Sequence, residues 1–181
     1  MTRASRNVAI GLSSAFGLLL LCVLIRPAGL AANDGLSYFG GYKTTVIPYT
    51  LAFFLVAYFY WETAKILVVE NSSKRHMTMA MRAMAVLLVG LVLTPHNLVD
   101  PIHTKIGTAL FVLQLLLTIW FIAKVEFSWV NLGLGLLELF GGLVSFYYLP
   151  KPHGLLLQGQ VIFQLAFGVL LFRILNRTIK A

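Results

Sequence analysis

The sequence predicts an all-α fold, a polytopic bundle of six transmembrane helices with both chain termini in the cytoplasm. Of its 181 residues, 59% are hydrophobic and only 11% are charged, whereas soluble domains are about 25% charged. The hydrophobic residues form six continuous runs, each close to the ~20 residues that a helix needs to cross a bilayer. Continuous runs also argue against a transmembrane β-barrel, whose strands show short alternating segments. We expect one domain, 1–181, with spans at about 8–25, 46–69, 77–94, 103–123, 129–149 and 155–175.

The first run, 8–25, is predicted to be a span and not a cleaved signal peptide. It is long for the core of a signal peptide, and Arg26 follows it directly. The next segment, 27–43, is polar and rich in glycine, with a turn signal at 33–35. We therefore expect a loop between the first two spans, on the side of the membrane opposite to the termini.

Charged residues lie at the facing ends of the second and third runs. Glu62 and Lys65 stand three residues apart near the end of the second run, on one face of the expected helix. Arg82 stands near the start of the third run, at a depth similar to that of Glu62 if the two helices are antiparallel neighbours. Two interpretations stay open: an ion pair between Glu62 and Arg82, or two side chains that reach the headgroups separately.

The fifth run, 129–149, carries a carboxylate near its middle, Glu138. A charge at that depth costs at least ~2.5–3.5 kcal/mol on insertion scales, so such a side chain normally faces protein or water and not lipid. Small residues let neighbouring helices approach closely, which predicts that this helix packs at the centre of the bundle. The residues three, four or seven positions from Glu138 include Asn131, Gly135, Gly141, Gly142 and Ser145.

The distribution of lysine and arginine predicts the orientation. Nine of these residues fall on the side of the termini and four on the other side, with Lys65 left out because it lies within a run. The positive-inside rule then puts both termini in the cytoplasm. We expect the protein to lie in the cytoplasmic membrane. The nine are Arg3, Arg6, Lys74, Arg75, Arg82, Lys124, Arg173, Arg177 and Lys180, and the four are Arg26, Lys43, Lys105 and Lys151.

Three polar residues share the expected middle of the membrane, namely Glu138, Gln114 of the fourth span and Gln164 of the sixth, and Asn131 lies on the face of Glu138. One interpretation is a proton or cation site, because burial disfavours the charged form of a carboxylic acid and lets it exchange protons near neutral pH. The other is a structural contact, in which a protonated Glu138 bonds to a glutamine and holds helices together. Such contacts contribute about 0.6 kcal/mol on average.

A second candidate site lies in the outer loops, where histidine and aspartate gather. His96, Asp100 and His103 precede the fourth span, and Asp34 and His153 are expected on the same side of the membrane. Imidazoles and carboxylates could bind zinc or another divalent ion and support metal-assisted hydrolysis. However, the spacing matches no specific motif. Such residues also commonly solvate a loop or cap a helix, and Asp100 followed by proline is a natural helix start.

Several classes of protein are excluded. A bis-histidine haem protein needs histidines inside facing spans, whereas the four histidines of this sequence lie at the edges of the runs. The sequence has no phosphate-binding loop, no G-x-S-x-G and no dinucleotide fingerprint, so we expect no cofactor. The net charge of +8 comes from residues at the ends of apolar runs, which does not indicate nucleic-acid binding. The single cysteine, Cys22, excludes a disulfide framework.

Two short motifs carry a resemblance to a known family. They are Gly35-Leu-Ser-Tyr-Phe-Gly40 after the first span, and Pro95 followed by His103 at the start of the fourth. With them, the layout resembles uncharacterised six-span membrane families, in particular the domain of unknown function 998. That resemblance implies a six-helix fold and no particular activity.

Three functions follow as predictions. The leading one is a small integral membrane protein without enzymatic activity, an accessory subunit or scaffold in contact with the lipid bilayer. Its small-residue faces would pack internally, against a protein partner or against a second copy. The alternatives are a proton-coupled permease that uses Glu138, Gln114 and Gln164, and a metal-dependent membrane hydrolase that uses the outer histidines and aspartates on a lipid-like substrate. A cavity that reaches Glu138 would favour the permease, and a packed Glu138 would argue against it.

Overall fold

The computed structural model confirms the all-α fold class: the described part of the chain has six long helices, each long and apolar enough to cross a membrane. It describes residues 1–32, 34–70, 75–151 and 154–178, and for residues 69, 70, 96–100 and 178 the backbone alone. No strand occurs in these ranges. The long helices are α1 (Arg3–Ile25), α2 (Val46–Glu70), α3 (Arg75–Leu93), α4 (His96–Trp120), α5 (Trp129–Tyr148) and α6 (Leu156–Thr178). The short ones are the 3-10 helices η1 (Pro27–Ala31) and η2 (Gly35–Gly41) and a π-helical turn, η4 (Phe121–Val125).

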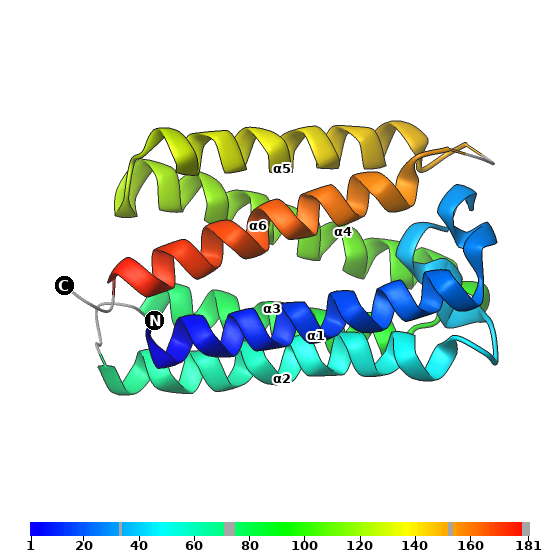
Figure 1. Cartoon of the computed structure of the whole chain (residues 1–181), viewed down its shortest axis with the longest axis horizontal. Helices are drawn as coiled ribbons and strands as arrows, with labels where there is room; N and C mark the ends of the chain where they lie inside the picture. Colours follow the sequence, from blue (N-terminus) through cyan, green and yellow to red (C-terminus); the bar gives the residue numbers. More distant parts are fainter. Residues whose placement is uncertain (33, 71–74, 152–153, 179–181) are drawn as a thin grey trace.

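The helices form two groups, α1 to α3 and α4 to α6 (Figure 1). Within the groups, α2 packs against both α1 and α3, and α5 packs against α6 along its length. Contacts of α1 with α6 and of α3 with α4 join the two groups. The N-terminus and the last turn of α6 lie at the same end of the bundle, where the backbone N–H of Thr2 donates to Asn176 Oδ1 over 3.2 Å. We call this the terminal end.

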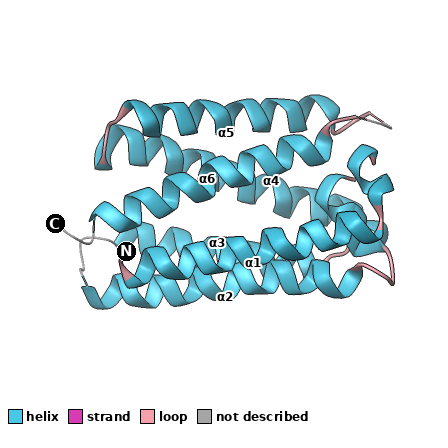
Figure 2. Cartoon of the chain, in the orientation of Figure 1, coloured by secondary structure: helices cyan, strands magenta, loops and turns pink. Residues whose placement is uncertain are grey.

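The opposite end is covered by η1 and η2, so the segment expected to be an open loop is instead a helical cap (Figure 2). Phe39 anchors the cap, because its ring is fully buried in the bundle. The hydroxyl of Thr45 donates to the carbonyl oxygen of Phe39 over 2.7 Å. Gly35 has a φ of 56°, which favours glycine, and this turn lets the N–H of Leu36 donate to Gln160 Oε1 of α6 over 2.8 Å. We call this the capped end.

The start of α4 differs from the predicted fourth span. The helix begins at His96, before the expected start at 103, and continues through Pro101. Proline fixes φ near the helical value, but it has no N–H to donate to the preceding turn. A missing N–H is tolerated best near a helix N-terminus, because the first N–H groups have no partner within the helix. The part of α4 that counts as a candidate span begins at Pro101.

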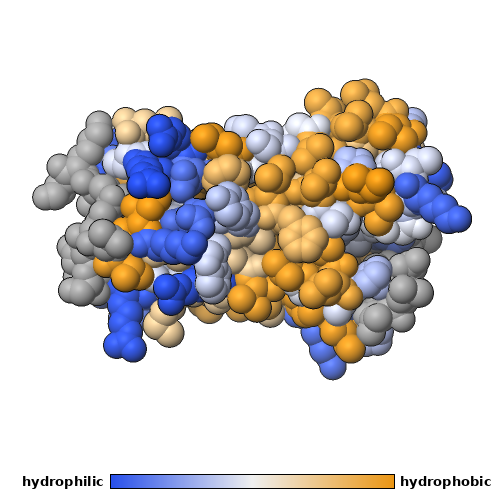
Figure 3. Space-filling view, turned by 90° about the horizontal axis from the view of Figure 1, so that it is seen from below, coloured by the Kyte–Doolittle hydropathy of each residue, from blue (hydrophilic) through white to orange (hydrophobic). Residues whose placement is uncertain are grey.

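The outside of the bundle is apolar over most of its length. In the face of Figure 3, a broad hydrophobic band lies between hydrophilic residues that gather mainly at the terminal end. Large side chains exposed on the helices include Leu24, Trp61, Val86, Leu116 and Phe146. Because such an exposed band is characteristic of a surface covered by lipid, we conclude that the chain is an integral membrane protein in contact with a bilayer.

Candidate functional site: a cavity between the helix groups

A cavity of about 670 Å³ lies between the two helix groups toward the capped end. All six long helices contribute to its wall, which is mostly apolar and includes Leu12, Phe53, Leu88 and Phe111. A volume of about 300–1,000 Å³ with apolar walls and a few polar groups is typical of sites for small ligands. The cavity is therefore the candidate binding site of this protein.

Polar groups gather where the cavity meets the cap. They belong to the cap and to the beginnings of α4 and α6, and we call them the polar end of the cavity. The polar end comprises Asp34, Ser37, His103, Thr104 and Gln160. The rest of the wall adds few polar side chains, among them Gln164 and Thr108.

One side of the cavity is open between α4 and α5. These helices leave the η4 turn together and diverge toward the capped end (Figure 1). Wall residues on both sides of the gap are exposed: Val112 of α4 is 51% exposed, and Leu143 and Phe146 of α5 are 60% and 77% exposed. The gap lies within the apolar part of the two candidate spans, so the opening faces the hydrocarbon of the bilayer.

At the polar end, three residues form a chain of hydrogen bonds. Ser37 Oγ lies 2.6 Å from His103 Nε2, and His103 Nδ1 lies 2.6 Å from the carbonyl oxygen of Thr94. His103 is 6% exposed. This chain links η2 to the end of α3 and the beginning of α4. The sequence did not indicate it, because Ser37 and His103 are 66 positions apart and match no spaced motif.

Next to Ser37, a cluster of aromatic and basic side chains lies on the cap. The guanidinium carbon of Arg26 lies 3.5 Å from the ring centroid of Tyr42 and 5.8 Å from that of Tyr38. A hydrogen bond with Tyr42 and one with Arg26 lower the pKa of Tyr38 from its ordinary value. Cation–π contacts of this kind help to hold the cap on the first span.

The predicted midplane residues do not converge on the cavity. Glu138 is fully buried, and its Oε2 accepts a hydrogen bond from Thr118 Oγ1 over 2.5 Å, while Oε1 has no hydrogen-bond partner among the described residues. Glu138 is not part of the cavity wall. The amides of Gln114 and Gln164 bond to each other reciprocally, each over 3.0 Å, and only Gln164 lines the cavity. The geometry around Glu138 is that of a packed contact between α4 and α5.

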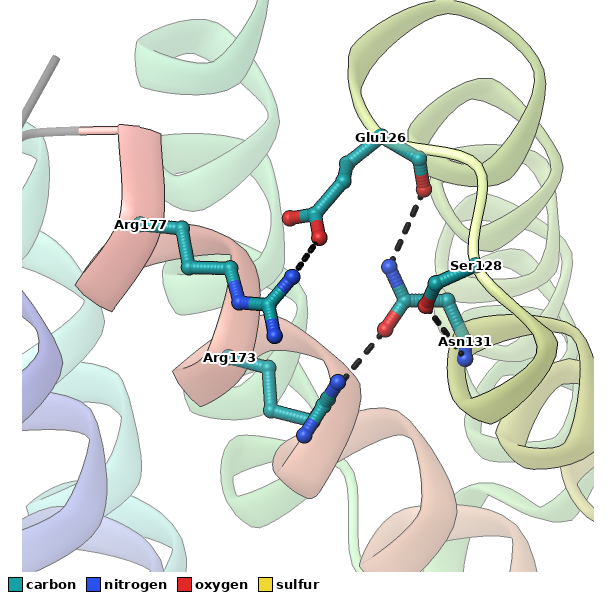
Figure 4. Close-up of polar contacts among 5 residues, drawn as sticks. All are labelled: Glu126, Ser128, Asn131, Arg173 and Arg177. Atoms are coloured by element: carbon teal, nitrogen blue, oxygen red, sulfur yellow. Dashed lines mark hydrogen bonds and ion pairs between the residues drawn. The ribbon is translucent and has the colours of Figure 1, made fainter.

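Asn131 shares a face of α5 with Glu138 but lies at the terminal end, where it helps to join α6 to the turn before α5 (Figure 4). Its amide donates to the carbonyl oxygen of Glu126 over 3.0 Å, and its Oδ1 accepts from Arg173 Nε over 3.2 Å. Ser128 caps α5 by accepting from the N–H of Asn131 over 3.1 Å. An ion pair between Arg177 and Glu126 completes the cluster. These bonds close the bundle at the end away from the cavity.

The bonds of this cluster should differ in strength. Asn131 is fully buried, so Asn131→Leu leaves its partners unsatisfied and should lower the free energy of unfolding by about 1–3 kcal/mol. The side chains of Arg177 and Glu126 are 56% and 24% exposed, so Arg177→Met should cost less than about 1 kcal/mol. Unfolding by SDS in mixed micelles measures both. Equal losses for the two variants would contradict this ranking.

The charged residues of α2 and α3 pair within a helix or pack on a neighbouring ring. Lys65 Nζ lies 2.6 Å from Glu62 Oε1 on its own helix. Within the described chain no ion pair joins Glu62 to Arg82; the Arg82 guanidinium lies 5.6 Å from the ring centroid of Trp61 instead. Because Arg82 is exposed, its side chain is free to extend to the headgroups.

The outer histidines and aspartates come together only in part. Asp34 and His103 both line the polar end. The side chains of His96 and Asp100, and all of His153, lie outside what the structure describes. Among the described residues, no group of three or more His, Cys, Asp or Glu could hold a metal ion. The predicted metal site therefore stays a prediction.

No family model matches the chain, and neither curated proteins nor solved structures give a significant match.

Proposed function

We propose that the protein binds a lipid-like amphiphile in the cavity between its helix groups. The observation that carries this proposal is the form of the cavity, an apolar volume of about 670 Å³ with its polar groups at one end. An acyl chain would lie along Leu12, Phe53 and Phe111, and a headgroup would meet Ser37 and Gln160 at the polar end. Burial of an apolar chain supplies affinity, and a few placed polar groups supply orientation.

The side opening supports this choice of ligand. A water-soluble ligand would need an aqueous path, whereas the exposed wall residues of α4 and α5 face the region of the hydrocarbon. A lipid could move into the cavity from the bilayer without crossing water.

Ligand binding is favoured over the other predicted functions on specific grounds. A pure scaffold or accessory subunit needs no cavity of this size. A permease that couples transport to Glu138 would need that carboxyl group in the cavity wall, and it is buried against Thr118 instead. Membership of the family with the domain of unknown function 998, and a cytoplasmic membrane with both termini inside, remain proposals from the sequence.

Filling the cavity tests the proposal. A side chain added at Gly107, in the cavity wall, would first meet Leu91 Cδ2, which lies 3.7 Å from the Cβ position. Gly107→Leu should therefore take up space in the cavity and reduce photo-crosslinking to a phosphatidylethanolamine that carries a diazirine in one acyl chain. We expect a loss of tenfold or more, equivalent to about 1.4 kcal/mol of binding. Digestion and mass spectrometry should place the wild-type crosslinks in α4 and α5 near the cavity.

Gly133→Leu is the matched control. It makes the same change on α5 outside the cavity wall, where no described atom beyond the adjoining stretch of α5 lies within 4 Å of the Cβ position. It should crosslink as the wild type does. Equal crosslinking of the folded Gly107→Leu variant would contradict the proposed site.

A further inference from the structure

The protons of the Ser37–His103–Thr94 chain can be placed from its geometry. The carbonyl oxygen of Thr94 can only accept a hydrogen bond, so His103 Nδ1, 2.6 Å away, carries a proton and donates it. In a neutral imidazole, Nε2 is then the acceptor. The hydroxyl of Ser37, 2.6 Å from Nε2, therefore donates to it. A serine hydroxyl is thus hydrogen-bonded to a histidine whose other nitrogen is fixed by a third group.

This is the arrangement of a nucleophile, a general base and an orienting group, which is recognised by geometry and not by order in the chain. Here the orienting group is a backbone carbonyl. We propose that Ser37 is a nucleophile activated by His103, and that the pair cleaves the ester bond of an acyl lipid held in the cavity. This inference rests on the proposed function, because it assigns chemistry to the headgroup end of the same ligand.

The location of the pair suits that substrate. Ser37 and His103 both line the polar end, where the apolar wall gives way to the cap. In an acyl lipid, the ester bond joins the apolar chain to the polar head. A lipid with its acyl chain in the apolar part of the cavity would thus have its ester group near Ser37.

Gln160 can supply the remaining part of such a site. Its Oε1 accepts the N–H of Leu36, the residue before Ser37, over 2.8 Å. This bond holds the amide beside the cap and leaves Nε2 as a donor, because the described residues show no hydrogen bond from it. A Cβ at Gly35 would collide with the Gln160 amide, so this glycine permits the close approach. A side-chain amide can stabilise the oxyanion that forms in acyl transfer.

The reaction balances with water as the second reactant. Ser37 Oγ forms a bond to the ester carbonyl carbon while its proton passes to His103 Nε2. The tetrahedral intermediate collapses, the bond to the alkoxy oxygen breaks, and the leaving alcohol takes the proton from Nε2. Water then attacks the acyl-serine, gives a proton to Nε2, and releases the carboxylic acid as that proton returns to Ser37. The products are an alcohol and an acid, and nothing is oxidised or reduced.

The same hydrogen bonds also tie the cap to α3 and α4, so the test separates reactivity from stability. An alkyl fluorophosphonate forms a covalent bond with a serine that has been activated as a nucleophile. We expect it to label the purified full-length protein in nanodiscs, with the modified peptide containing Ser37. Labelling should be absent in Ser37→Ala. It should fall on the order of 10²-fold or more in His103→Ala, which keeps the serine and removes its base.

Two controls keep the outcome clear. Ser13→Ala alters a serine that is exposed on α1 outside the cavity, and it should label as the wild type does. Thermal unfolding shows whether each variant is folded. Hydrolysis of 4-methylumbelliferyl palmitate should follow the labelling across the series.

The results also separate this inference from the proposed function. An unlabelled Ser37 in folded wild-type protein, or equal labelling of folded His103→Ala, would overturn the inference. If the diazirine lipid still crosslinks to the cavity in that case, lipid binding stands without the chemistry. If the lipid does not crosslink either, both fall.

Discussion

Lysine at position 138 is expected to destabilise the bundle by about 3 kcal/mol or more, whereas glutamine there is expected to leave it folded. Glu138 is fully buried, and among the described residues its one hydrogen bond comes from Thr118. A lysine would place an unpaired charge at this depth, which is among the most costly changes in a membrane helix. A glutamine carbonyl can accept the Thr118 bond in place of the carboxyl oxygen, so we expect a change within about 1 kcal/mol.

The chain contains a natural reporter for this measurement. Cys22 is its single cysteine and is fully buried, so a fluorogenic maleimide should react with it only as the bundle opens. The rate of that reaction across an SDS series gives the relative stability of the two variants. If Glu138→Gln unfolded as readily as Glu138→Lys, the carboxyl group would do more than make a contact, and the proton-site interpretation would regain support.

Gly141→Leu should separate α5 from α6. A Cβ at Gly141 would lie 2.6 Å from the backbone nitrogen of Phe163 and 2.7 Å from the carbonyl oxygen of Gly159. Both are backbone atoms of α6, so the clash cannot be relieved by turning a side chain. We expect a loss of stability at the upper end of the ~1–3 kcal/mol that overpacking costs, or beyond it.

Gly133→Leu serves as the matched control for this change as well, because it adds the same side chain to α5 in open space. In the Cys22 assay it should behave as the wild type does. Equal stability of the two leucine variants would mean that α5 and α6 do not approach as closely as the structure has them.

The six helices could be predicted because a single property, continuous hydrophobicity over the width of a bilayer, determines them. The cap was missed because its composition is that of a loop. Glycine-rich segments carry no hydrophobic period, and the burial of Phe39 depends on a space that the other helices create. The early start of α4 does not follow from the sequence, because aspartate followed by proline indicates a helix start, whereas the helix continues through Pro101.

The burial of Glu138 could be predicted from the cost of exposing it to lipid, but its surroundings could not. Whether a polar face meets a cavity or a neighbouring helix depends on how the helices pack, and Thr118 was not singled out by any pattern. Asn131 shows the limit of helical periodicity. It shares a face with Glu138 but stands seven residues away, about 10 Å along the axis, and so bonds to Arg173 at the terminal end.

Because the cavity opens to the hydrocarbon between α4 and α5, the affinity of a ligand for this protein has to be expressed relative to the amount of that ligand in the bilayer. An acyl chain gains about 0.8 kcal/mol per methylene when it leaves water for hydrocarbon, so a long-chain ligand is already dissolved in the leaflet before it meets the protein. Occupancy then depends on the mole fraction of the ligand among the surrounding lipids, and not on its concentration in the buffer. Diluting the sample in buffer should leave occupancy unchanged, whereas adding inert lipid should lower it.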